Sequence, residues 1–278
     1  MTAAFSAISL LGLSVLQAIA EFGRFARFTG AVTRWLLFSP ARWLRWRLLG
    51  PQFYAVGVAT IPVVALTGAF IGMVLALESF HQFQLIGQEG RLGGIISISV
   101  TKQIGPVLAA VMVAGRVGCA LAAELGTMRV TEQLDALRAM ATDPVGHLAV
   151  PRVVACIVMT PILTIYSDIL GVWGGWLITV QFYRVSPYEF WEFTASFVDF
   201  WEPTAGIIKS VFFGAGIGLI ACYKGFQCRA GAAGVGRAAT EAFVYSFLAI
   251  IVMNLILAQV LNAIGIMFIR GAAAGPLG

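Results

Sequence analysis

Five long apolar runs, separated by short polar segments, follow one another along this chain. Each approaches or exceeds the roughly 20 apolar residues that a helix needs to cross the hydrocarbon core of a membrane. The runs cover residues 53–77, about 92–123, 153–183, roughly 204–223 and 242–269. This pattern predicts an all-α, polytopic membrane protein with five transmembrane helices.

Basic residues gather in alternate connections between these runs. They are Arg24, Arg27, Arg34, Arg42, Arg45 and Arg47 before the first run, Arg129, Arg138 and Arg152 after the second, and Lys224, Arg229 and Arg237 after the fourth. The connections after the first and third runs contain only Arg91 and Arg184 as basic residues. Because Lys and Arg accumulate in cytoplasmic loops, we predict a cytoplasmic N-terminus and an extracytoplasmic C-terminus.

Composition narrows the functional classes. Of the 278 residues, 59% are hydrophobic and 11% are charged, whereas about a quarter are charged in an ordinary soluble domain. An ordinary soluble enzyme is therefore excluded.

The net charge of +5 comes from basic residues beside the apolar runs, so we expect membrane lipids and no nucleic acid as partners. The four cysteines form no CxxC pair; we expect packing roles for them, no metal and no cofactor.

No constellation of catalytic groups is visible in the sequence. His81 and His147 fall on opposite sides of the membrane in the predicted topology, so they cannot share a site. GxSxG, HExxH and GxxxxGK[ST] motifs are missing from the sequence. We expect no catalytic residues, and any ATP hydrolysis would need a separate polypeptide.

Two segments outside the runs mix aromatic and polar residues. In residues 39–47, Ser39 and Pro40 begin a predicted interfacial helix rich in Trp and Arg, although its arginines serve equally well as a topology signal. In residues 186–201, Ser186 and Glu189 have the spacing of a capping box. We predict there a short extracytoplasmic amphipathic helix with acidic residues outward and an aromatic stripe toward lipid, formed by Phe190, Phe193, Phe197 and Trp201.

Charged residues interrupt three of the apolar runs: Lys102 and Arg116 the second, Asp168 the third and Lys209 the fourth, and we single out the first three. A charge inside a span costs about 2.5–3.5 kcal/mol on insertion scales, so each is a functional candidate. Gly105 and Pro106 follow Lys102, and the proline predicts an opened helix with free backbone carbonyls. For Arg116 we expect an extension of the side chain toward the cytoplasm.

Glycines mark two further features. Gly68 and Gly72 form a GxxxG motif, for which we predict helix packing within one protomer, with dimerisation as the alternative. The glycine-rich stretch at residues 231–236 joins two apolar runs rather than a strand and a helix. It therefore predicts a tight cytoplasmic turn and no dinucleotide site.

Residues 124–138 are the most informative segment outside the runs. Val130, Leu134 and Leu137 recur at helical spacing. Opposite charges lie three residues apart in two pairs, Arg129 with Glu132 and Asp135 with Arg138. The segment predicts a short amphipathic helix in a cytoplasmic loop, which suits the groove of a partner protein. An ordinary solvated loop helix has the same periodicity and stays open as an alternative.

At these residues the chain resembles the MlaE (YrbE) family, the permease subunits of ABC transporters that work with MCE-domain lipid-transfer proteins. Three blocks carry the resemblance: GAFIGMVL from Gly68, GPVLAA from Gly105 with AGRVG from Ala114, and AELGTMRVTEQLDAL from Ala123. The resemblance is collinear from about residue 20 to about residue 265.

The resemblance implies a single permease domain over residues 1–278. An N-terminal interfacial segment would cover residues 1–50, the five-span bundle residues 51–269, and a periplasmic tail residues 270–278. The family further implies a homodimer in the bacterial inner membrane, two copies of a P-loop ATPase, and an oligomer of an MCE-domain protein. A cytoplasmic coupling helix at about residues 127–141 would dock on the ATPase.

Two sets of site residues follow from the resemblance by position. The implied substrate-binding residues are Leu75, Gln82, Phe83, Ile86, Lys102, Gln103 and Ile104. The implied ATPase-coupling residues are Glu124, Arg129, Thr131, Glu132, Gln133, Asp135 and Arg138. Gln103 stands where the family commonly has an acid, which calls into question any headgroup contact or ion pair that needs this carboxylate. Lys102 still offers a point charge to a phosphate.

We therefore expect a non-catalytic permease subunit that moves lipid, with phospholipid as the expected cargo, between the inner membrane and an MCE-domain partner. The alternative is a carrier for an amphipathic substrate, driven by an ion gradient with Lys102 and Asp168 as its relay. A membrane-embedded lipid enzyme is the third class, which the scattered His and Cys residues disfavour.

Overall fold

The described part of the chain is helical and contains no β-strand. The computed structural model describes residues 2–38, 44 and 46–273. Five helical stretches are long and apolar enough to cross a membrane: Trp46–Leu85, Glu89–Val130, Val145–Phe182, Trp201–Phe226 and Ala232–Met267. The prediction of an all-α polytopic protein with five spans is confirmed.

Short 3-10 and π-helical segments lie between or beside the α-helices of several of these stretches. The α-helices are α1 (Thr2–Phe38), α3 (Trp46–Val56), α4 (Ile61–Leu85), α5 (Leu92–Ser99), α6 (Gly105–Val113), α7 (Cys119–Val130), α8 (Gln133–Ala139), α9 (Val150–Trp176), α10 (Pro187–Phe197), α11 (Trp201–Phe226) and α12 (Ala232–Ala273). The 3-10 segments are η1 (Val58–Thr60) and η2 (Glu89–Arg91). The π-helical segments are η3 (Val100–Ile104), η4 (Ala114–Gly118), η5 (Val145–Ala149) and η6 (Leu177–Phe182).

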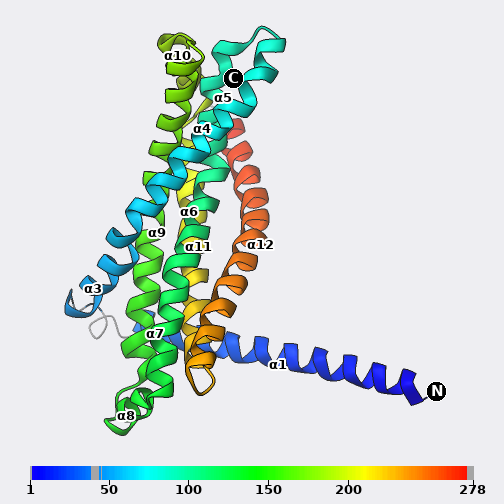
Figure 1. Cartoon of the computed structure of the whole chain (residues 1–278), viewed down its shortest axis with the longest axis vertical. Coiled ribbons are helices and arrows are strands. Elements are labelled where there is room, and N and C mark those ends of the chain that lie inside the picture. Colours follow the sequence, from blue (N-terminus) through cyan, green and yellow to red (C-terminus); the bar gives the residue numbers. More distant parts are fainter. Residues whose placement is uncertain (1, 39–43, 45, 274–278) are drawn as a thin grey trace.

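The bundle is elongated and has two distinct ends (Figure 1). Helix α8 lies at one end, together with the connection between α11 and α12, and α10 lies at the opposite end. We call these the α8 end and the α10 end. His81, late in α4, belongs to the α10 end, whereas His147, in η5, belongs to the α8 end. The two histidines are separated, as the sequence predicts.

Helix α9 is central to the packing, because α4 and α11 both run along it. Glycines bring these backbones into contact. A Cβ added to Gly72 would lie 1.7 Å from the carbonyl oxygen of Gly171, and one added to Gly214 would lie 2.4 Å from that of Cys156. Because small residues permit such close approach, the Gly68/Gly72 motif packs within this chain, as predicted.

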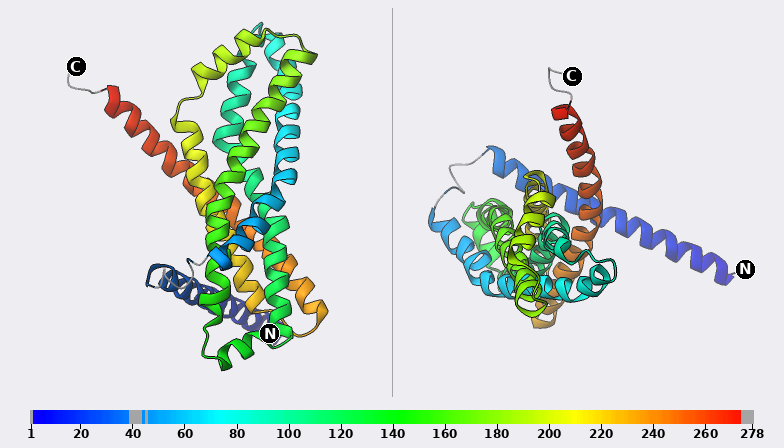
Figure 2. Two further views of the ribbon diagram at one scale, coloured as in Figure 1. Left: turned by 90° about the vertical axis from the view of Figure 1, so that its left-hand side faces the viewer. Right: turned by 90° about the horizontal axis from the view of Figure 1, so that it is seen from above.

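Helix α1 runs across the α8 end of the bundle (Figure 2). The ring of Phe25 lies 5.2 Å from that of Tyr223 in α11. The Tyr223 hydroxyl donates a hydrogen bond of 3.2 Å to the main-chain oxygen of Glu21. Further along α1, the indole of Trp35 donates to the Asp143 carboxylate. These contacts join α1 to both α11 and the segment before α9.

The predicted interfacial helix at residues 39–47 is mostly outside the described residues, which omit 39–43 and 45. Trp46 and Arg47 are described, and they begin α3. This helix is the first part of the stretch Trp46–Leu85, so the end of the predicted segment belongs to the first span.

The aromatic stripe of α10 faces the protein, so the prediction that it faces lipid is wrong. Phe190 is fully buried, and a Cβ on Gly93 of α5 would lie 2.3 Å from the Phe190 carbonyl oxygen. Neighbouring Gly94 likewise touches α10. The two glycines lack side chains, which lets α10 pack directly on α5.

The predicted capping box at the start of α10 is absent, since the Ser186 side chain makes no capping hydrogen bond. Trp201, which the sequence placed at the end of the aromatic stripe, is the first residue of α11.

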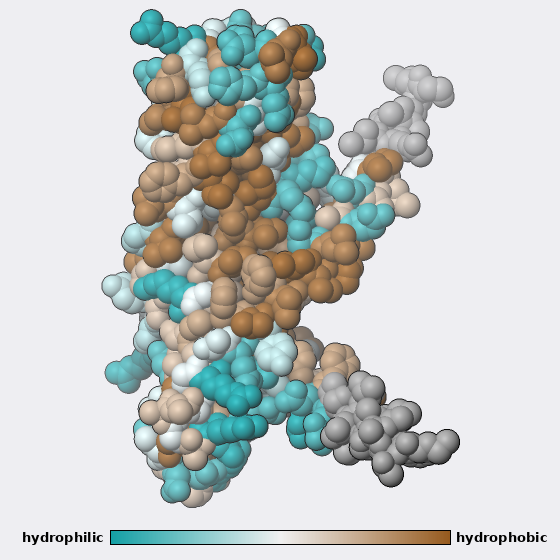
Figure 3. Space-filling model, turned by 45° about the vertical axis from the view of Figure 1, so that its right-hand side comes forward, coloured by the Kyte–Doolittle hydropathy of each residue, from teal (hydrophilic) through white to brown (hydrophobic). Residues whose placement is uncertain are grey.

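Helix α12 leans away from the rest of the bundle toward its C-terminal end (Figure 2). Much of its apolar surface is exposed, including Leu248, Val252 and Leu255. Apolar surface also covers the middle of the molecule between more polar ends (Figure 3). In a membrane protein such a surface meets lipid tails or another apolar helix.

The glycine-rich connection before α12 is shorter than predicted. Gly231 has a φ of +85°, a conformation that glycine adopts without steric cost. Helix α12 begins at the next residue, Ala232. The predicted tight turn is therefore confirmed at residue 231, whereas residues 232–236 are helical.

Candidate functional site

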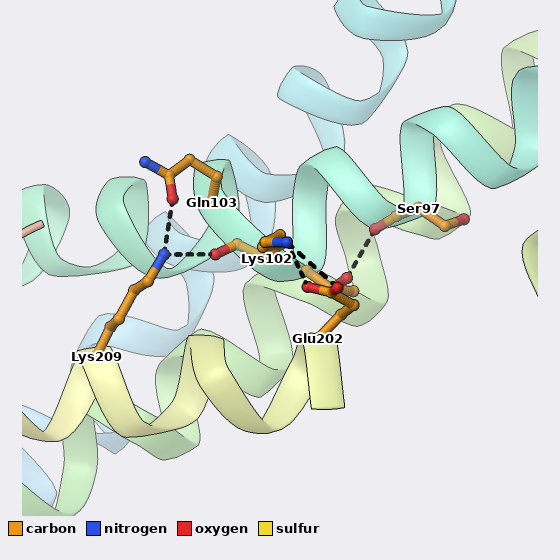
Figure 4. Close-up of polar contacts among 6 residues, drawn as sticks. Ser97, Lys102, Gln103, Glu202 and Lys209 are labelled. Atoms are coloured by element: carbon orange, nitrogen blue, oxygen red, sulfur yellow. Dashed lines mark hydrogen bonds and ion pairs between the residues drawn. The ribbon is translucent and has the colours of Figure 1, made fainter. Parts of the chain in front are cut away.

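A polar cluster interrupts the apolar interior where η3 meets α11. It consists of Lys102, Gln103, Glu202 and Lys209, and we call it the Lys102 cluster (Figure 4). The first two residues lie in the π-helical segment η3, and the other two lie in α11. Two spans distant in sequence therefore meet through polar side chains.

Pro106 explains why this helix accepts a polar partner. A proline has no N–H to offer the carbonyl four residues earlier, which here belongs to Lys102. That oxygen accepts a hydrogen bond of 3.0 Å from the ammonium group of Lys209. The prediction that Gly105 and Pro106 free a backbone carbonyl is confirmed.

Lys209 is 2% exposed. Besides the Lys102 carbonyl, its ammonium group donates to Oε1 of Gln103 at 2.7 Å. Both acceptors are neutral, and within the described residues Lys209 makes no ion pair. Hydrogen bonds to a buried cation offset part of its desolvation cost, so Gln103 has a structural role beside the one the resemblance implies.

Lys102 forms an ion pair with Glu202, with Nζ 3.0 Å from Oε2. Because Gln103 stands where the family commonly has an acid, the sequence alone offers no carboxylate for an ion pair at this point. In the structure Glu202 of α11 supplies that carboxylate. The Lys102 side chain is 35% exposed and that of Glu202 is 17% exposed. Because the cluster combines two ammonium groups with one carboxylate, it has a net positive charge, which favours an anionic ligand.

Glu202 and Lys209 are the members of the cluster that the sequence analysis did not assign to a site. A signal for Lys209 was present, because it is a lone charge within the fourth apolar run and a charge there needs an interior partner. Glu202 precedes that run and gave no such signal.

The predicted substrate-binding residues in α4 and at Ile86, which directly follows it, form two groups. Leu75 and Phe83 pack against an apolar cluster that includes Val100, the first residue of η3. This contact connects them to the segment that holds Lys102, Gln103 and the half-buried Ile104. Gln82 and Ile86, in contrast, are exposed at the α10 end.

Asp168 lies apart from the hydrogen bonds of the Lys102 cluster. Its Oδ1 is buried and has no hydrogen-bond partner among the described residues. The same oxygen occupies the space beside Gly105, where an added Cβ would lie 1.8 Å away. The described part of the chain shows no hydrogen bond or ion pair from Asp168 to Lys102, so the proposed relay has no direct link.

Arg116 has a specific partner within the protein. Its guanidinium donates a 2.6 Å hydrogen bond to the hydroxyl of Thr60, which lies in η1 between α3 and α4. The residue is nonetheless exposed. The expectation that the Arg116 side chain extends toward the cytoplasm is therefore incomplete. Through Thr60, Arg116 also connects η4 to η1, the break between α3 and α4.

The segment between α7 and α9 forms the tip of the α8 end (Figure 1). A continuous helix over residues 127–141 is wrong, because a turn at Thr131 and Glu132 separates α7 from α8. Glu132 has a φ of 59°, a left-handed conformation that cannot continue a right-handed helix. Leu134 is fully buried and anchors α8.

Most of the predicted coupling residues are exposed at this tip: Arg129, Thr131, Glu132, Gln133, Asp135 and Arg138. Asp135 and Arg138 form the expected ion pair at 2.7 Å, whereas the structure shows no ion pair between the described Arg129 and Glu132. Glu124 instead pairs with Arg152 at 3.2 Å. Since Arg152 is buried in α9, this bridge braces α7 against the bundle.

Comparison with known proteins agrees with this architecture. The family model described as permease MlaE matches residues 49–260. A probable ABC transporter permease of Synechocystis is 43% identical over 206 residues, covering 74% of this chain and 78% of the relative. One from Rickettsia typhi is 36% identical over 253 residues, covering 91% and 96%. The intermembrane phospholipid transport system permease protein MlaE of Haemophilus influenzae is 34% identical over 261 residues, covering 93% and 98%. The chain therefore belongs to the MlaE family of membrane permeases.

Proposed function

We propose that this protein is the non-catalytic permease subunit of an ABC transporter that moves phospholipid between the bacterial inner membrane and an MCE-domain partner. Membership of the MlaE family supports the transporter class. The Haemophilus relative is named as part of an intermembrane phospholipid transport system. Energy would come from a separate P-loop ATPase, because the chain has no GxxxxGK[ST] motif.

The single observation that carries this proposal is the exposed charged tip formed by α8 and the turn before it. A short element with one buried anchor, Leu134, and several exposed charged side chains suits docking on another protein. In the proposed topology the α8 end faces the cytoplasm, where the ATPase resides. The arginines of α1 and of the α11–α12 connection at the same end support this orientation.

The Lys102 cluster is the proposed contact for the phosphate of the cargo. Its net positive charge and the partial exposure of Lys102 support this role. The apolar side chains of Leu75, Phe83 and Ile104 would contact acyl chains, with Gln82 and Ile86 at the outer opening. Two protomers would share the cavity, and the exposed apolar surface of α12 and α4 supports association with a second copy in the membrane.

The coupling hypothesis is tested by removing charges from the tip. In liposomes that contain the permease, its ATPase and the MCE-domain partner, Arg129→Gln with Glu132→Asn should lower phospholipid transport per ATP hydrolysed roughly fivefold or more. Asn is chosen because it tolerates the left-handed conformation at residue 132. Arg47→Ala with Glu192→Ala removes one charge of each sign elsewhere and should leave coupling unchanged. Unaltered coupling in the tip variant would refute the assignment.

A carrier driven by an ion gradient is the second candidate, and the unpaired Oδ1 of Asp168 favours it. A buried ionisable group inside a span is a common element of proton and ion pathways. This alternative predicts phospholipid transport by the permease alone when a proton gradient is imposed on the liposomes. The ABC proposal predicts none until the ATPase and ATP are added, so the same vesicles decide between the two.

A further inference from the structure

A polar cavity of about 410 Å³ lies at the α8 end, between α1, the end of α11 and the start of α12. We call it the charged pocket. Its lining combines four cationic side chains with two carboxylates: Arg24, Lys224, Arg229 and Arg237 with Glu21 and Glu241. The pocket shares no residue with the Lys102 cluster, and the proposed transport function makes no use of it.

Two of the four cations share one carboxylate within the protein. Glu241 receives Lys224 at 3.0 Å and Arg237 at 2.8 Å, one on each carboxylate oxygen. Lys224 also lies 4.0 Å from the centre of the Tyr245 ring, a cation–π contact. These interactions hold the floor of the pocket in one arrangement.

The other two cations, Arg24 and Arg229, have no hydrogen bond or ion pair from their side chains within the described residues. Both are exposed and line the pocket from two different elements, α1 and the α11–α12 connection. Glu21 also lines the pocket, but its carboxylate makes no ion pair with either arginine in the described structure. Two guanidinium groups thus converge on one cavity with their donors unused.

The lining favours an anion with several oxygen acceptors. A guanidinium offers paired donors that match phosphate oxygens. Gly234, in the first turn of α12, also lines the pocket, and a helix N-terminus adds partial positive charge there. The lining cations outnumber the carboxylates, so the cavity has a net positive charge.

The position of the pocket indicates which kind of anion would bind there. The lining ends at Glu241 and Tyr245, and the uncharged run of α12 begins at residue 242. Beyond Tyr245, α12 exposes Leu248, Val252 and Leu255. A phosphate in the pocket would therefore sit beside an apolar surface suited to acyl chains, an arrangement typical of lipid headgroup sites.

We infer that the charged pocket binds the phosphate of an anionic phospholipid through Arg24 and Arg229, at the opposite end of the bundle from the proposed cargo entrance. The bound lipid would tie α1 to the α11–α12 connection, since one arginine comes from each of these elements. This inference does not depend on the direction, the energy source or the cargo of transport.

The test measures lipid binding to the purified full-length protein in detergent by native mass spectrometry. Phosphatidylglycerol, phosphatidylcholine and inorganic phosphate are titrated separately. Arg24→Gln with Arg229→Gln is compared with Arg27→Gln with Arg47→Gln, which removes the same charge from exposed positions outside the pocket. We expect the pocket variant to lose roughly tenfold or more in affinity for phosphatidylglycerol, because charge-assisted hydrogen bonds are lost. The control should stay within about twofold, as expected for surface charges alone.

Three results would overturn the inference. Equal affinity of the wild type for phosphatidylcholine would show that the net charge of the pocket selects nothing. An equal loss in the control variant would indicate general attraction to the basic end. Competition by inorganic phosphate at the same concentrations as phosphatidylglycerol would assign the pocket to a soluble anion. Arg24→Lys with Arg229→Lys keeps the charge, and partial recovery of binding in this variant would exclude misfolding as the cause of the loss.

Discussion

The ammonium group of Lys209 lies 3.0 Å from the main-chain oxygen of Lys102, the carbonyl to which Pro106 has no N–H to donate. A side chain of one span therefore supplies a hydrogen bond that the proline of another span cannot make. This arrangement explains why a charged residue is tolerated in the middle of α11, where Lys209 is almost fully buried.

Replacing Lys209 with Met should destabilise the protein by about 1–3 kcal/mol, because the Lys102 carbonyl and the Gln103 amide oxygen each lose their donor. Thermal unfolding of the purified protein in detergent measures this change. The informative comparison is with Pro106→Ala. Lys224→Met would be a poorer control, because it would also remove the ion pair of that lysine with Glu241.

Pro106→Ala returns an N–H at the position where the helix lacks one. In the double variant with Lys209→Met, we expect a smaller loss of stability than the sum of the two single changes, because the new donor satisfies the Lys102 carbonyl. Strictly additive losses would mean that the carbonyl is not the source of the coupling between α6 and α11.

Gln103→Glu would place a carboxylate where an amide oxygen now accepts from Lys209 at 2.7 Å. The charge-assisted hydrogen bond should raise the unfolding temperature. At the same time the Lys102 cluster would lose its net positive charge, so less phosphatidylglycerol should be retained on purification. Gln181→Glu adds the same charge at an exposed site in η6. Equal lipid loss in both variants would argue against the cluster as a phosphate contact.

Gly72→Ala should destabilise the bundle by about 1–3 kcal/mol, because overpacking at a tight contact forces the backbones apart. The added Cβ would lie 1.7 Å from the Gly171 carbonyl oxygen. Gly236→Ala is the matched control, since nothing lies within 4 Å of its Cβ position in α12. That variant should gain about 0.5–1 kcal/mol from the better helix propensity of Ala. Opposite shifts of the melting temperature are therefore expected, and a loss of similar size in both variants would contradict the packing assignment.

Hydropathy and single-residue chemistry predicted much of this structure. The five spans follow from the lengths of the apolar runs, because a helix in lipid must satisfy its own backbone and expose apolar side chains. The opened helix at Lys102 follows from the missing N–H of Pro106 alone. Both properties are local, so one sequence is enough to derive them.

The features that were missed depend on contacts between distant segments. The aromatic stripe of α10 has the same periodicity whether it faces lipid or the glycines of α5, so Phe190 was assigned to the wrong environment. Glu202 became a partner of Lys102 only through the packing of α11 against η3. The break at Glu132 depends on a left-handed conformation that residues other than glycine adopt uncommonly, and periodicity gives no sign of it.

The attachment of α8 depends on one side chain, and this gives a last prediction that does not require the transport partners. Helix α8 has seven residues, too few for a stable isolated helix in water, and Leu134 is its fully buried residue. Leu134→Ala should cost about 2–5 kcal/mol of local stability, enough to open α8 without unfolding the spans. Hydrogen exchange should therefore become faster in residues 133–139 and stay unchanged in α9. Arg138→Ala, which removes only an exposed ion pair with Asp135, should leave exchange nearly unaltered. If exchange at α8 is equally fast in both variants, or already fast in the wild type, Leu134 is not the anchor and the rigid tip required for coupling is not present.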